Sequence, residues 1–261
     1  MASLRVFLLG GWASYRALFG WLSPWILIPT FVVTPVFQIL FFAYVGRTAG
    51  VGSDMFFLIG NAIQYASIPC LFAMGNTIAG ERYSQTLGLL LVSPARRIPL
   101  FLGRSLPVIV NGLVCSLLAL GVGAVVLHVA LPWGSLPLLV VVVTVSAFSC
   151  TGLGLVTAAL ALRARETAVL SNIVMGVLLI FCGTNVALSS LPAWMAAVGR
   201  CLPLTHGIEA ARELVTGVGW SEVAGLVGTE AVIGVVYLAI GLLALAYFER
   251  ESRRSATLEV A

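Results

Sequence analysis

The sequence predicts an all-α membrane protein with six transmembrane helices, an N-terminal interfacial helix, a cytoplasmic helix after the second span and short re-entrant outer helices before the sixth. Two observations predict this class. Hydrophobic residues make up 60% of the 261 positions and charged residues 9%, whereas a soluble domain carries roughly a quarter charged residues. The apolar residues are also gathered in long blocks, and a bilayer core about 30 Å thick needs roughly 20 of them per helix. A soluble helical protein, whose outer helices need polar faces, is a poor fit.

Six apolar blocks are long enough to be spans. They are Pro24–Val45, Met55–Ala79, Leu102–Val129, Leu136–Leu162, Thr167–Leu188 and Val227–Phe248. We interpret residues 1–261 as one transmembrane domain, in which residues 1–22 form the interfacial helix and residues 24–188 hold spans one to five. An outer segment at 189–225, the sixth span at 227–248 and a cytoplasmic tail at 249–261 complete it. The interfacial helix is predicted because Arg5 and Arg16 fall on one side of it, beside an apolar cluster. It can serve simply as an anchor.

The arginines predict the orientation in the membrane. All 14 basic residues are Arg, and eleven of them flank the connections on one side of the predicted spans, against Arg47, Arg200 and Arg212 on the other. By the positive-inside rule both termini are cytoplasmic and the segment 189–225 is outside. We therefore expect a multi-pass protein of the bacterial plasma membrane, in contact with anionic lipid headgroups and not with nucleic acid.

Residues that could supply energy for transport are scarce. The chain has no Lys, so it cannot form a P-loop, whose Lys contacts the nucleotide phosphates. All ten acidic residues are expected in connections or at span edges, which leaves the span cores without charge, whereas ion-coupled carriers usually hold titratable groups there. We expect any energy for transport to come from another subunit.

Metal and disulfide chemistry has little to build on. The five cysteines show no paired spacing, and His128 and His206 are far apart in the sequence. We expect no metal site, no catalytic residue and no cofactor bound by this chain.

Polar side chains inside the predicted spans are candidates for a substrate path. Asn61 and Gln64 are three residues apart and share a helix face. The full set is Asn61, Gln64, Asn111, Asn172 and Asn185. Hydrogen bonding between helices is the alternative role for each of them. An uncharged path would suit amphipathic cargo better than a small ion.

The segment Glu81–Arg97, between the second and third spans, predicts a short amphipathic helix that ends at Pro94. Glu81-Arg82, followed by Leu90-Leu91-Val92-Ser93-Pro94, resembles the coupling segment of the membrane subunits of ABC type-2 exporters. The implied contacts with an ATP-binding subunit are Glu81, Arg82, Tyr83, Leu87, Leu90, Leu91, Ser93, Pro94, Arg96 and Arg97. One departure is Gln85-Thr86-Leu87-Gly88, where the family more often has Gly-Thr-Leu-Glu. Interfacial packing is the alternative role for this helix.

The outer segment carries a second match to the same family. Its motifs follow the family's order, and the residues singled out are Leu191, Pro192, Trp194, Pro203, His206 and Arg212. The stretch is too short and too broken by proline to span the membrane, so re-entrant helices fit it best. Trp194 can cap the outer end of the pathway or anchor the interface. Glu209, Arg212 and Glu213 are expected to form a solvated face or a lateral gate.

The resemblance covers nearly the whole chain and implies a non-catalytic permease subunit of an ATP-driven exporter. Its implied partners are two copies of a cytoplasmic ATP-binding subunit, which bind ATP and Mg²⁺, and a second permease subunit. The compact loops look most like the drug and antibiotic efflux branch, similar to daunorubicin-type permeases. A lipid- or glycan-exporting permease, a secondary carrier and a non-transporting assembly factor are the alternatives.

Overall fold

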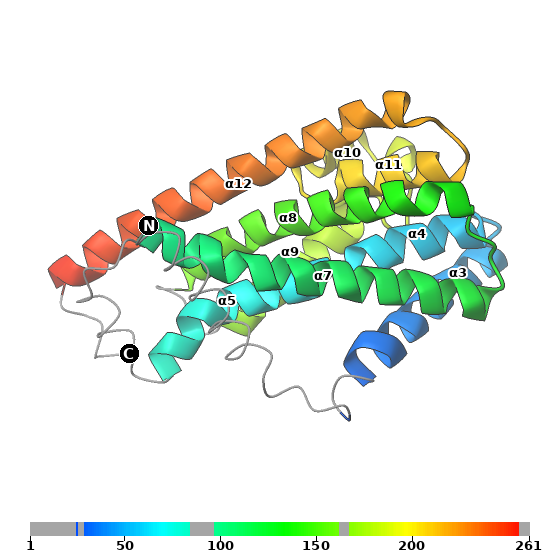
Figure 1. Cartoon of the computed structure of the whole chain (residues 1–261). Coiled ribbons are helices and arrows are strands. Elements are labelled where there is room, and N and C mark those ends of the chain that lie inside the picture. Colours follow the sequence, from blue (N-terminus) through cyan, green and yellow to red (C-terminus); the bar gives the residue numbers. More distant parts are fainter. Residues whose placement is uncertain (1–24, 26–28, 84–96, 162–166, 256–261) are drawn as a thin grey trace.

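The computed structural model describes residue 25 and residues 29–83, 97–161 and 167–255, and every regular element among them is a helix. Figure 1 shows an elongated bundle in which the long helices α7, α8 and α12 run along the molecule and α10 and α11 lie at one end. In chain order the elements are η1 (Pro29–Val33), α3 (Thr34–Ala49), α4 (Asp54–Gln64), α5 (Ser67–Tyr83), α7 (Arg97–Leu127), η2 (Trp133–Ser135), α8 (Leu136–Leu160), α9 (Thr167–Phe181), η3 (Leu188–Ser190), α10 (Ala193–Cys201), α11 (Thr205–Val215) and α12 (Trp220–Ser255).

The described residues hold four helical stretches that are long and apolar enough to cross a membrane. They are Asp54–Asn76, Leu102–Leu127, Trp133–Leu160 and Trp220–Phe248. The predicted first span is divided between η1 and the 16-residue α3, and the predicted fifth span yields only the 15-residue α9. The all-helical class is confirmed for the described residues, whereas six full spans are not. The N-terminal interfacial helix at residues 1–22 lies outside them.

The second predicted span is broken in the middle. Helix α4 ends at Gln64 and α5 begins at Ser67, so the span predicted over Met55–Ala79 consists of two helices, within the candidate span Asp54–Asn76. Pro69 explains the break, because a proline has no backbone N–H to donate and its ring would clash with the carbonyl four residues earlier, at Tyr65. The backbone turns there through a bond from Ala66 N to Ile63 O.

The other boundaries differ by one or two turns. Helix α9 stops at Phe181, seven residues before the predicted end of the span at Leu188, and Gly183 follows in the left-handed region at φ +76°. Such a glycine is a common helix terminator. Helix α12 begins at Trp220 and therefore takes over the end of the predicted outer segment.

Helices α8 and α12 share an extensive interface. A Cβ at Gly152 would lie 2.8 Å from the carbonyl oxygen of Gly234, and a Cβ at Gly234 would lie 2.9 Å from Ser149 Cα. Small residues at such crossings let transmembrane backbones approach each other. This contact brings the side chains of α8 within reach of those on α12.

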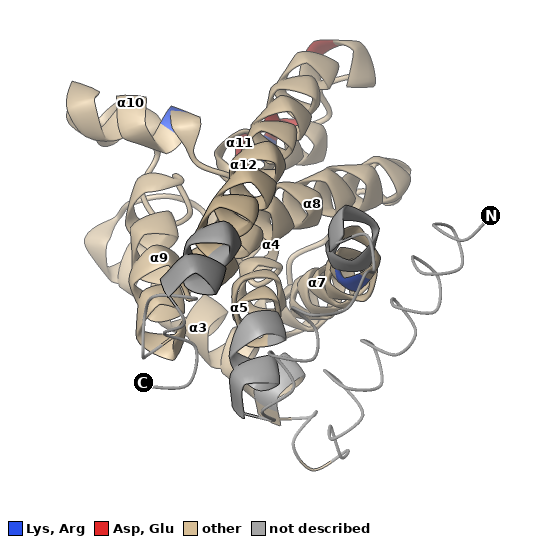
Figure 2. Cartoon of the chain, turned by 90° about the vertical axis from the view of Figure 1, so that its left-hand side faces the viewer, with Lys and Arg blue, Asp and Glu red and all other residues tan. Residues whose placement is uncertain are grey.

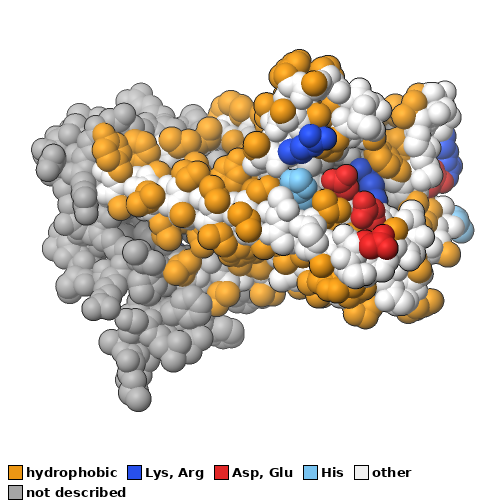
Figure 3. All heavy atoms as spheres, turned by 90° about the horizontal axis from the view of Figure 1, so that it is seen from above, with side chains coloured by type: hydrophobic (Ala, Val, Ile, Leu, Met, Phe, Trp, Pro, Cys, Tyr) orange, Lys and Arg blue, Asp and Glu red, His pale blue; other side chains and the backbone are white. Residues whose placement is uncertain are grey.

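The surface of the described helices is inverted relative to a soluble protein. In Figure 3 a broad hydrophobic zone covers the described part of the flank, and the charged side chains of the described residues on this face lie toward one end. Large apolar side chains such as Phe37, Val125 and Leu243 are about 70% exposed or more. Figure 2, turned by 90°, likewise shows very few charged residues on the described helices. An apolar flank of this size suits contact with lipid.

Candidate functional site

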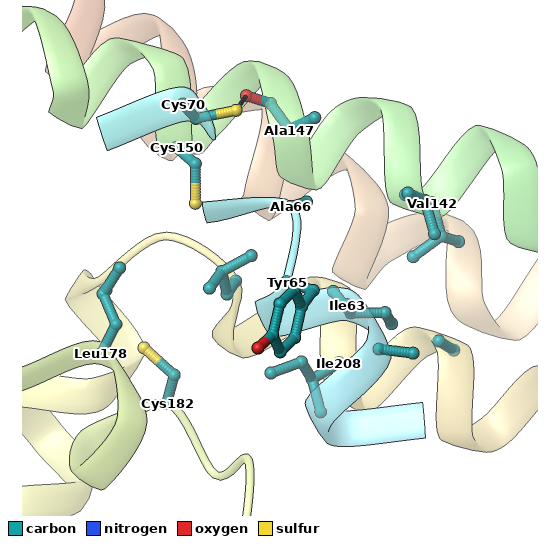
Figure 4. Packing of buried hydrophobic residues seen from close by; sticks show 14 of the residues in the cluster. Ile63, Tyr65, Ala66, Cys70, Val142, Ala147, Cys150, Leu178, Cys182 and Ile208 are labelled. Atoms are coloured by element: carbon teal, nitrogen blue, oxygen red, sulfur yellow. Dashed lines mark hydrogen bonds between the residues drawn. The ribbon is translucent and has the colours of Figure 1, made fainter. Parts of the chain in front are cut away.

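The break between α4 and α5 leaves a buried amide without partners. Gln64 is fully buried at the end of α4, and neither its Oε1 nor its Nε2 has a hydrogen-bond partner among the described residues. Around the break, Figure 4 shows Ile63, Tyr65 and Ala66 packed among apolar residues that include Ile208 of α11. An unpaired polar group in such surroundings is energetically costly. Gln64 is thus a candidate path residue whose whole amide group has no partner among the described residues.

Asn61, one turn earlier on α4, has hydrogen-bond partners for both polar atoms of its amide. Its Nδ2 donates to Phe57 O at 2.9 Å and to Asn185 Oδ1 at 2.8 Å, and its Oδ1 accepts from Gln38 Nε2 at 2.9 Å. The structure therefore brings together Asn61 and Asn185, both singled out from the sequence, and adds Gln38 of α3, which sequence reasoning missed. This amide cluster joins α3, α4 and the chain after α9.

The remaining two candidate path residues are not part of that cluster. Asn111 is half-buried on α7, where its Nδ2 has no partner and its Oδ1 accepts from Cys115 Sγ at 3.9 Å. Asn172 is exposed on α9 and donates to Ala168 O of its own helix. The predicted set does not form one continuous patch in this chain.

At the end of the bundle that holds α10 and α11, hydrogen bonds join these two helices. Thr205 Oγ1 donates to Gly199 O at 2.6 Å, and His206 Nε2 lies 3.0 Å from Arg200 O. These contacts satisfy carbonyls at the end of α10, which a helix leaves unpaired. His206 thereby contacts the end of α10, and the re-entrant position of these two short helices stays a prediction.

The other residues singled out in the segment 189–225 each make few contacts. Trp194 is largely exposed and its ring meets Phe181 edge-on, with the ring centroids 6.0 Å apart. Pro192 precedes α10, and Pro203 O accepts from Cys182 Sγ at 3.1 Å in the turn before α11. Leu191 N donates to Leu188 O.

Arg212 is not on a solvated face. Its guanidinium donates to three carbonyl oxygens, those of Phe56, Gly183 and Thr184, at 2.8 to 3.1 Å, and its Cζ lies 3.5 Å from the centroid of the Phe56 ring. Burial lowers the pKa of Arg212 to about 10, and the charge of Glu209 acts in the opposite direction. Arg212 therefore stays charged at neutral pH and fastens α11 to α4 and to the turn after α9.

Glu230 corrects the expectation of charge-free span cores. It lies within the candidate span Trp220–Phe248 and is fully buried. Its carboxylate accepts from Ser149 Oγ, from Leu204 N at 2.7 Å and from Gly207 N at 3.3 Å. The sequence predicts this glutamate at the edge of the span that begins at Val227, but α12 begins seven residues earlier, at Trp220.

The described residues include five cysteines but no cluster of metal-ligating side chains. Within residues 29–83, 97–161 and 167–255, no three His, Cys, Asp or Glu side chains are grouped to hold a metal ion. All five cysteines are free; four are buried and Cys201 is exposed.

The predicted coupling residues are only partly described. Glu81, Arg82 and Tyr83 form the last residues of α5, and Arg97 begins α7. Residues 84–96, which hold Leu87, Leu90, Leu91, Ser93, Pro94 and Arg96, lie outside the described part of the chain. The segment thus starts and ends on two helices that pack against each other.

Comparison with known protein families identifies the family of this chain. The family of ABC-2 transporter proteins matches residues 48–243, three quarters of the chain. The chain belongs to the ABC-2 transporter family. A comparison with curated proteins found no match.

The region that matches the ABC-2 family contains the main structural features of this chain. It includes the whole Glu81–Arg97 segment, the broken helix α4–α5, the helices α10 and α11, and Glu230. The family match and the long apolar helices therefore show a multi-pass membrane protein of a transport system. The roles of its individual residues are proposals.

Proposed function

We propose that this chain is the permease subunit of an ATP-driven exporter, itself non-catalytic, that moves amphipathic cargo outward across the bacterial plasma membrane. Membership of the ABC-2 family over residues 48–243 carries the proposal. The absence of Lys excludes a P-loop in this chain, so a separate ATP-binding subunit would bind ATP and Mg²⁺. We further propose two such subunits, a second permease subunit and cytoplasmic termini.

The energy would enter through Glu81–Arg97. This segment joins α5 to α7, and both helices pack on α8 at the centre of the bundle. Movement of a partner subunit at the segment would therefore be passed directly to the packed helices. The broken α4–α5 helix, with Gln64 at the break, is where we place cargo, since broken helices in transporters often line substrate sites. Drug-like molecules, as in daunorubicin-type permeases, are the cargo class that we favour.

A complex reconstituted with its ATP-binding subunit tests the coupling role. We expect Glu81→Ala and Leu90→Asp each to weaken subunit binding and to abolish ATP-driven dye efflux. Glu251→Ala is the matched control, because it removes an acidic residue expected on the same side of the membrane but outside the segment. Unchanged binding and efflux in both coupling variants would sink the assignment.

One observation favours a second candidate, an ion-coupled carrier. A buried carboxylate within a span, as at Glu230, is typical of proton- or sodium-driven transport. Efflux that collapses with an uncoupler but survives ATP depletion would support this alternative. Efflux that stops on ATP depletion and persists with the uncoupler would support the exporter.

A further inference from the structure

The N-terminus of α11 has no capping side chain of its own. Leu204 occupies the N-cap position in the left-handed region at φ +77°, and it offers no hydrogen-bonding side chain. The first N–H groups of a helix need outside acceptors, and a left-handed backbone is unfavourable for a leucine. The start of α11 is therefore a conformation that its neighbours must hold.

Glu230 supplies the missing acceptors from a different helix. Oε1 accepts from Leu204 N at 2.7 Å and Oε2 accepts from Gly207 N at 3.3 Å, so one carboxylate satisfies two N–H groups at the start of α11. The acceptor oxygens at this position also complement the partial positive charge of a helix N-terminus. The side chain performs for α11 what an Asp or Ser at the N-cap position usually does.

The same carboxylate is joined to a third helix. Ser149 Oγ of α8 donates to Glu230 Oε1. Nearby, α11 and α8 touch so closely that a Cβ at Gly207 would collide with Ser146 Oγ. The helices α8, α11 and α12 thus meet at one fully buried acidic group.

We propose that Glu230 is a positioning residue that latches the outer helix α11 to α8 and α12, so that the start of α11 moves with these two long helices. The latch depends on acceptor oxygens, and filling the space with a side chain of equal size does not replace it. Opening it would free the turn Leu202–Leu204 from the bundle.

Cys182 reports on the latch without any transport assay. This thiol is fully buried beneath the turn, and its Sγ lies 3.1 Å from Pro203 O. In full-length protein with the exposed Cys201 replaced by Ser, N-ethylmaleimide labelling of Cys182 in membrane vesicles is followed by mass spectrometry. We expect Glu230→Gln to raise the labelling rate about tenfold, since its amide nitrogen would face a backbone donor.

Matched variants separate the latch from packing. Glu222→Gln changes an exposed glutamate on the same helix and should leave the rate unchanged, whereas Ser149→Ala should raise it about threefold because one donor of the latch is lost. Parental labelling of Glu230→Gln would overturn the proposal. If that variant does not fold, parental labelling of Ser149→Ala would overturn it instead. The measurement requires no cargo or ATP, so its failure would leave the proposed function standing.

Discussion

Two buried polar regions of this protein are built in opposite ways. Around α11, the charged groups of Arg212 and Glu230 are bonded to backbone atoms of other segments, with three carbonyls on the first and two N–H groups on the second. At the break between α4 and α5, the amide of Gln64 has no partner. Buried polar groups therefore join α11 to its neighbouring segments, whereas at the break a buried amide is satisfied by no described residue.

The largest effect is expected at Arg212. Replacing it with Ala leaves the carbonyls of Phe56, Gly183 and Thr184 without their donor, and we expect the free energy of unfolding to fall by about 3 kcal/mol. Reversible denaturation in detergent measures this change. Arg200→Ala is the control, because Arg200 is exposed on the neighbouring α10. Equal losses in the two variants would show that the carbonyl contacts contribute little.

A smaller effect is expected at Asn61. Asn61→Ala removes bonds to Gln38, Asn185 and Phe57, and bonds between helices in membranes contribute about 0.6 kcal/mol on average, so a loss of about 1–2 kcal/mol follows. The control Asn172→Ala removes an exposed amide bonded only to its own helix. If both variants unfold alike, the amide cluster is not a stabilising contact.

The smallest effect is expected at the Arg47–Asp54 ion pair, which joins α3 to the start of α4 near the surface. Exposed pairs contribute little because water screens them. Arg47→Ala should therefore leave the thermal unfolding midpoint close to that of the parent protein. A loss as large as that of Asn61→Ala would mean that this connection holds the bundle more than its exposure indicates.

The sequence predicted the long elements of the fold well, because apolar blocks such as those of α7, α8 and α12 are dictated by the bilayer. The break at Tyr65 was missed, although Pro69 signals it: proline tolerance varies with context, and Pro107 lies inside α7 without ending it. Among the candidate site residues, Asn61 and Gln64 were predicted as one patch because they share a helix face. Their different environments depend on α3 and on the chain after α9, which periodicity does not reveal.

The contacts of Glu230 and Arg212 could not be predicted from the sequence. Their partners are mostly backbone atoms from segments far along the chain, and backbone groups leave no trace in a residue pattern. The sequence indicates only that Glu230 lies at membrane depth, since it is inside the apolar block Val227–Phe248. A carboxylate at that position is a signal for a buried contact.

The contrast between Asn61 and Gln64 is tested most directly by the free energy of unfolding of Asn61→Leu and Gln64→Leu in one preparation. Replacing a bonded amide should lower it, whereas replacing an amide without partners should raise it by about 1 kcal/mol, because an unpaired buried polar group is removed. We predict a loss for Asn61→Leu and a gain for Gln64→Leu, accompanied by impaired efflux in the latter. A loss of similar size in both variants would contradict the account.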